Sequence, residues 1–195
     1  MRFHRLLVAV FVVLVASSSF AVPAPQAATQ RFYFDNYSLV YPTSYMPQGL
    51  PAGTQGCYLI RTAPFACVFV AMQRKGEDTV VPQGRAILSL MLGRLSAGNQ
   101  ITSQTVEEIP ASQLKSPITL GRIYRAHTSR GLTLEARLYL SNVSGKKALV
   151  GYATLTGTNV PPDIQPLLTT DAAAVAAEFD QIAASIKLET ASRGY

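Results

Sequence analysis

The chain has 195 residues, a formal net charge of +6, and charged residues make up only 14% of it. Its basic residues are scattered, and no basic run is longer than a pair such as Lys146 and Lys147. Strong nucleic-acid-binding proteins gather lysine and arginine on one surface, so the sequence argues against a nucleic acid as the partner.

Residues 1–21 predict a cleavable secretory signal peptide. A short positive stretch precedes an uncharged apolar run at 6–16, and small residues at Ser19 and Ala21 mark the cleavage point. The apolar run is about half of the roughly 20 residues that a bilayer span needs. We therefore expect an exported protein, periplasmic or secreted to the medium, with no integral membrane span after cleavage. The bonds after residues 24, 27 and 28 are alternative cleavage sites.

Removal of these 21 residues would leave 174, which is enough for one domain with a hydrophobic core. The leader holds two of the 17 basic residues and none of the 11 acidic ones, so the mature chain has a net charge of +4. We expect a flexible Pro/Ala-rich segment at 22–30, a single domain at 31–188 and a frayed tail at 189–195.

The first half of the domain predicts strands. Residues 31–34 and 37–41 indicate two short strands around a turn at Asp35 and Asn36, and a Pro/Gly-rich loop follows at 42–56. Residues rich in β-formers then predict strands at 57–61 and 66–74.

Cys57 and Cys67 are the only cysteines, and an exported protein favours their pairing. A bend near Thr62 to Pro64 would place them opposite each other, within reach of a structural disulfide. Two buried free thiols are the alternative. With His127 as the only histidine of the mature chain, these residues are too few for a metal site, and no Cys-x-x-Cys motif indicates redox catalysis.

One helix and a polar strand lie in the middle of the chain. The helix follows the segment 75–78 and ends at Gly98 and Asn99. Its apolar stripe, which we assign to core packing, comprises Ile87, Leu88, Met91, Leu92 and Leu95. Residues 101–109 then predict a polar edge strand.

The clearest pattern is a meander of three strands at 118–128, 132–141 and 148–156. The middle strand alternates apolar and polar residues, which is typical of a strand with one buried face. A three-residue connection with Gly131 in the left-handed conformation would set Arg125 opposite Glu135.

A helix at about 171–188, with Thr170 as a candidate cap, closes the domain. Its buried stripe comprises Val175, Phe179, Ile182 and Ile186. The order of elements predicts an α+β fold, in which a largely antiparallel sheet of about six to seven strands is covered by helices, and it favours an α/β/α sandwich.

Two segments resemble the PsbP/DcrB-like superfamily. They are Tyr37-Ser-Leu-Val-Tyr-Pro42, like the early strand of those proteins that runs into an aromatic–proline pair, and Phe179-Asp-Gln-Ile-Ala-Ala-Ser-Ile-Lys-Leu188, like their closing helix. The resemblance covers about residues 31–188, although the tryptophan typical after the early proline is missing. It implies an α/β/α sandwich and a non-catalytic role as an adaptor, assembly factor or envelope protein, and it provides no site residues.

Catalytic motifs are not recognisable in the sequence. His127 is the only candidate base of the usual kind in the mature chain, and we interpret it as a strand histidine because no nucleophile elbow accompanies it. The paired acids at 77–78 and 107–108 have structural explanations, at a helix start and on opposite faces of a strand. We therefore expect no catalytic residue, metal or cofactor.

A mixed aromatic and charged strand face is the candidate partner-binding surface. It comprises Arg125, His127, Glu135, Arg137, Tyr139 and Tyr152. The alternative is that a helix covers this face and leaves these residues as its polar fringe. We expect a non-enzymatic accessory protein that binds another envelope protein through this face or through the 42–56 loop. A carrier of a small apolar ligand and an enzyme of unrecognised type are the alternatives.

Overall fold

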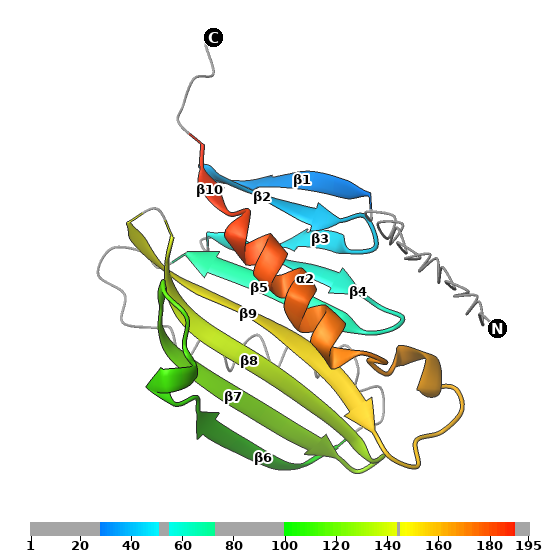
Figure 1. Ribbon diagram of the computed structural model, residues 1–195. Helices are drawn as coiled ribbons and strands as arrows, with labels where there is room; N and C mark the ends of the chain where they lie inside the picture. The colour runs from blue at the N-terminus through cyan, green and yellow to red at the C-terminus, as the bar shows by residue number, and fades with distance from the viewer. Residues whose placement is uncertain (1–27, 51–54, 73–99, 144, 190–195) are drawn as a thin grey trace, which may run out of the picture.

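The fold is described from a computed structural model of residues 28–50, 55–72, 100–143 and 145–189. Its centre is a seven-stranded antiparallel sheet with the strand order β3-β4-β5-β9-β8-β7-β6 (Figure 1). The strands are β3 (Met46–Gly49), β4 (Gly56–Arg61), β5 (Ala66–Met72), β6 (Ile101–Glu108), β7 (Ile118–Thr128), β8 (Leu132–Val143) and β9 (Lys146–Gly157).

A second, three-stranded sheet and one α-helix complete the described part of the chain. The small sheet has the order β1-β2-β10, and α2 lies across one face of the large sheet over β4, β5 and β9 (Figure 1). The bounds are β1 (Thr29–Phe34), β2 (Tyr37–Pro42), α2 (Ala172–Ala184) and β10 (Lys187–Leu188), with 3₁₀ turns η1 (Ala111–Gln113) and η2 (Gln165–Leu167).

This architecture confirms the predicted α+β class. The predicted loop at 42–56 was only partly right, because it contains the edge strand β3, which pairs with β4. The predicted helix at 79–97, and with it the second helical layer of an α/β/α sandwich, lies outside the described residues, as does the signal peptide at 1–21. No helix in the described ranges is long and apolar enough to span a membrane.

The meander follows its predicted register. Arg125 pairs with Glu135 across β7 and β8, and Gly131 has a φ of 75°, as the predicted turn requires. One face of β8 is buried at Leu132, Leu134, Ala136 and Leu138. Because side chains alternate along a strand, the polar residues of β8 lie on the other face, toward α2.

The face of the sheet under α2 forms one of two hydrophobic cores. Val175, Phe179 and Ile182 of α2 enter it together with the inner residues of β2, β4, β5 and β9. The helix begins at Ala172, and its cap is Asp171, one residue after the predicted Thr170, because Asp171 accepts a hydrogen bond from the Ala174 N–H at 2.9 Å. It ends at Ala184, and the Ser185 hydroxyl bonds the backbone of Val40, which starts the turn into β10.

The predicted disulfide between Cys57 and Cys67 is wrong. The turn occupies four residues, 62–65, so Cys67 pairs with Ile60, and Cys57 pairs with Val70. The two cysteines are thus three positions out of register, and an odd offset places their side chains on opposite faces of the sheet. Both are thiols, each buried in a different core.

This burial predicts that neither thiol reacts in the native protein. Burial raises the pKa of the Cys57 thiol to about 12, which suppresses the reactive thiolate. Ellman's reagent should detect no thiol in folded protein purified without reductant and two per chain after unfolding in guanidinium. Fewer than two thiols after unfolding would mean that the chain is oxidised.

Tyr37 carries a buried hydroxyl without a partner. The side chain is 1% exposed in the core between β2 and α2, and its hydroxyl makes no hydrogen bond. A buried unsatisfied polar group costs about 1–3 kcal/mol. Tyr37→Phe should therefore raise the free energy of unfolding by about 1 kcal/mol in urea denaturation. A loss of stability would show that the hydroxyl has a partner in solution.

Candidate functional site

A row of alternating charges crosses three strands on the α2 side of the large sheet. Glu107 of β6 bonds Arg125 of β7 at 2.6 Å, and Arg125 bonds Glu135 of β8 at 2.7 Å. Glu135 also accepts from Nε of Arg137 at 2.9 Å. We call the surface formed by Glu107, Arg125, Glu135 and Arg137 the ladder face.

The charges of the ladder face compensate one another. Burial opposes ionisation of Glu135, but hydrogen bonds from Arg125 and Arg137 outweigh it and hold the pKa of its carboxyl below the usual value. Hydrogen bonds to Glu107 and Glu135 raise the pKa of Arg125. Two carboxylates balance two guanidinium groups, so the surface suits a partner with both signs of charge.

His127 lies at one end of this surface. Its Nδ1 lies 2.9 Å from the Thr133 hydroxyl of β8, next to the Arg125–Glu135 pair in the register. This contact gives the ring a structural partner in the sheet, in line with its interpretation as a strand histidine. In the described ranges, no cluster of three or more histidine, cysteine, aspartate or glutamate side chains could hold a metal ion.

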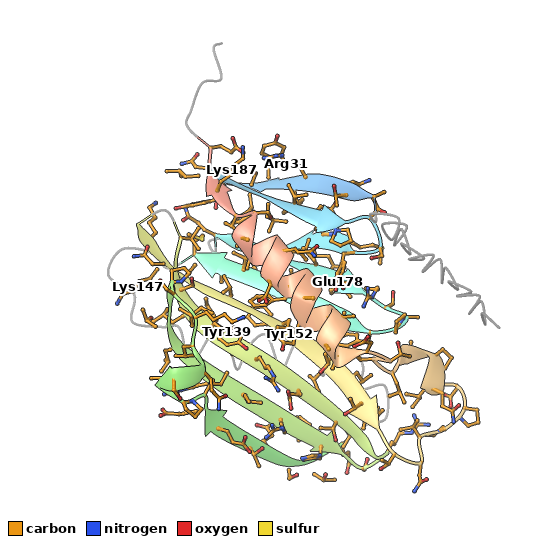
Figure 2. The ribbon with its side chains drawn as sticks, in the orientation of Figure 1. Arg31, Tyr139, Lys147, Tyr152, Glu178 and Lys187 are labelled. Carbon is orange, nitrogen blue, oxygen red and sulfur yellow. The ribbon has the colours of Figure 1, made fainter. Side chains whose placement is uncertain are left out.

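Tyr139 and Tyr152 belong to the covered part of the sheet. Their rings lie 5.7 and 5.1 Å from the ring of Phe179 on α2, and Figure 2 shows both beside the helix. Burial raises the pKa of Tyr152 to about 12, so its hydroxyl is neutral. The six predicted residues are therefore divided: α2 covers the two tyrosines, while Arg125, His127, Glu135 and Arg137 are partly exposed beside it.

A groove of about 550 Å³ begins at these tyrosines. One wall is α2 and the other is the segment 113–118 between η1 and β7, while β8 and β9 form the floor. Apolar side chains dominate the lining, among them Leu114, Ile118, Val143, Val150, Phe179 and Ile186. Its volume lies in the range of small-ligand pockets. Sequence reasoning missed the groove, and only the small alanines on one side of α2 hint at it.

The opposite side of α2 is fixed by a polar cluster. Glu178 accepts a hydrogen bond from the Tyr45 hydroxyl at 2.6 Å and two from Arg61 at 3.0 and 3.1 Å. The Arg61 guanidinium also lies 5.1 Å from the centre of the Tyr45 ring. Figure 2 shows Glu178 on the side of the helix away from the two groove tyrosines. This cluster sets the helix position that leaves the groove open.

Comparisons with known proteins give structural neighbours only. No protein-family model and no curated protein matches the sequence. The Ran-binding protein Mog1p of Saccharomyces cerevisiae is 8% identical, covers 83% of this chain and 96% of its own, and has a TM-score of 0.47. The PsbP protein CyanoP of Synechocystis is 13% identical, covers 89% and 98%, and has a TM-score of 0.35. A PsbP protein is thus among the neighbours that the structural comparison finds.

Proposed function

We propose that this protein is an exported, non-enzymatic accessory protein that binds another protein of the cell envelope through the ladder face. The observation that carries this proposal is the incomplete cover of the sheet, because α2 crosses β4, β5 and β9, and no helix of the described residues covers β6, β7 or most of β8 on the same face (Figure 1). The signal peptide predicted at 1–21 supports export.

The chemistry of the ladder face suits a protein partner. Its side chains hold one another in place through ion pairs, two between neighbouring strands and one within β8, so binding loses little side-chain entropy. Both signs of charge are presented, which disfavours a polyanion and allows specific pairing with a partner of matched pattern. The edge strand β6 adds polar side chains at Ser103 and Thr105, which share this face with Arg125.

A matched pair of variants on β6 tests the proposal. Thr105 faces the same side as Arg125, and its neighbour Gln104 faces the opposite side; both are exposed. The tagged protein is crosslinked in cells, and co-purifying envelope proteins are identified by mass spectrometry. Thr105→Arg should abolish capture of the dominant partner because it adds bulk and charge to the ladder face, and Gln104→Arg should retain it.

Equal capture by the two variants would overturn the ladder face as the interface. Thermal midpoints should agree with that of the natural protein to about 2 °C, since both positions are on the surface. A third variant, Arg137→Ala, should also weaken capture. Tyr139 is unsuitable for this test because its packing on Phe179 couples it to stability.

A second candidate function is the transport or storage of a small apolar ligand. The observation that favours it is the groove between α2 and the segment 113–118, whose lining is apolar with a few polar groups at its margins. The two candidate functions use different surfaces, and Tyr139 and Tyr152 mark the boundary between them. The variants Thr105→Arg and Gln104→Arg should both leave binding in the groove unchanged.

A further inference from the structure

We infer that the groove binds a single-chain amphiphile with an anionic head, such as a fatty acid carboxylate, with its head at the end near β10 and its chain directed toward Phe179. The inference rests on the carrier function proposed above and adds the class of ligand and its direction. It is carried by two observations, the apolar walls of the groove and the unequal distribution of charge between its two ends.

The middle of the groove is suited to an alkyl chain. Ala176 and Ala183 lie on the groove side of α2, where their small side chains leave room beside the ring of Phe179. Val143 and Val150 form the floor opposite them. Removing a methylene group from water contributes about 0.8 kcal/mol, so even a short chain in this channel provides appreciable binding energy.

Two lysines lie at the groove. Lys115 lines it and Lys146 pairs with the lining residue Val143, whereas Lys187 lies beside Arg31 at the outer edge of the small sheet (Figure 2). Lys187 pairs with Glu189 at 3.4 Å, whereas in the described part of the chain neither Lys115 nor Lys146 forms an ion pair. The end of the groove at Lys115 and Lys146 therefore carries uncompensated positive charge that complements an anionic head.

The other end has the opposite character. Asp180 is the only acidic residue of the lining, and it lies on α2 next to Phe179, six residues before Ile186. Burial is the main cause of the raised pKa of Tyr139 and Tyr152, and the charge of Asp180 adds to it. Arg137 beside these rings acts in the opposite direction, but its own charge is paired with Glu135 at 2.9 Å. An anionic head would be repelled there, and this repulsion gives the ligand its direction.

Isothermal titration calorimetry of the mature protein with decanoate and decanol tests both parts of the inference. The two compounds share a chain length and differ in the charge of the head. Decanoate should bind about fivefold more tightly, since exposed lysines provide modest attraction, and the preference should shrink at high salt. The double variant Lys115→Gln, Lys146→Gln should bind both compounds equally. Lys147→Gln, whose side chain alternates to the other face of β9, should keep the preference.

Filling the groove tests the location. Ala176→Phe places a ring in the channel and should weaken decanoate binding at least about tenfold. Ala177→Phe is the control, because Ala177 is exposed on the same helix and is not part of the lining. If Ala176→Phe lowers the thermal midpoint, Ala183→Phe repeats the test about two turns further along the same side of the helix. Unchanged decanoate binding in a folded filled variant overturns the inference.

The outcomes separate the inference from the carrier function. If decanoate and decanol bind equally well and Ala176→Phe abolishes the binding of both, the carrier function stands and the preference for an anionic head is wrong. Binding of neither compound would overturn both. Binding that Ala176→Phe and Ala177→Phe reduce equally would show that the ligand lies outside the groove, which also overturns both.

Discussion

Replacing Phe179 with alanine is expected to lower the free energy of unfolding by about 3–5 kcal/mol. The ring is 3% exposed, and it joins α2 to the sheet through contacts with Tyr139 and Tyr152. Its removal leaves a cavity that the strands of the sheet cannot close, because their backbone positions are fixed by pairing on both sides. The aromatic contacts add to the cost of the lost burial.

Urea denaturation followed by far-ultraviolet circular dichroism measures this effect. Tyr33→Ala is the matched control, since Tyr33 is also aromatic but is 55% exposed, and its change should stay within about 0.5 kcal/mol. Because Phe179 also lines the groove, Phe179→Ala should weaken ligand binding as well. A loss of less than about 1 kcal/mol would show that α2 is held mainly by its other contacts.

The meander was predictable because its signals are local. Alternating residues in β8 identify the buried face, and the connection at Gly131 fixes the register that pairs Arg125 with Glu135. Once this register is known, the contact between the charged side chains of β7 and β8 can be predicted as well. Three residues of the ladder face, Arg125, Glu135 and Arg137, could therefore be placed on one face from the sequence. The fourth, Glu107, joins them only through the pairing of β6 with β7.

The failed disulfide shows how sensitive such reasoning is to turn length. Moving the centre of the turn by one or two residues changes which side chains oppose each other, and an odd offset changes the face. The residues 62–65 contain one proline and no glycine to mark the centre of the turn. The strand β3 was missed for a related reason, because its Met-Pro-Gln-Gly sequence is typical of a loop and is stabilised as a strand only by pairing with β4.

The groove could not be predicted from the sequence because three distant segments form it. The 113–118 segment, the β8–β9 floor and the helix α2 meet only in the folded chain, and the course of α2 over the sheet decides whether a space remains. The same course decides which part of the predicted partner face is covered. The helix pattern shows which residues of α2 are buried, but it does not show which strands lie beneath them.

The position of α2 depends on Glu178, and replacing this residue with alanine should lower the free energy of unfolding by about 2–3 kcal/mol. Glu178→Ala would leave the Tyr45 hydroxyl without its acceptor in a side chain that is 2% exposed, and Arg61 without its carboxylate. Burial and the hydrogen bond to Glu178 raise the pKa of Tyr45, so this hydroxyl stays neutral and donates throughout the physiological range. Glu107→Ala, at an exposed ion pair, should cost at most about 1 kcal/mol.

A double-mutant cycle separates the Tyr45–Glu178 bond from general damage to the helix. The cycle combines Tyr45→Phe with Glu178→Ala, and urea denaturation of the four proteins should give a coupling energy of about 1–2 kcal/mol. Tyr45→Phe keeps the ring under Arg61 and removes only the donor. A coupling energy near zero would mean that the hydroxyl and the carboxylate act independently, and that Arg61 alone anchors this side of α2. In that case, Arg61→Met should shift α2 and change ligand binding in the groove, while Tyr45→Phe should not.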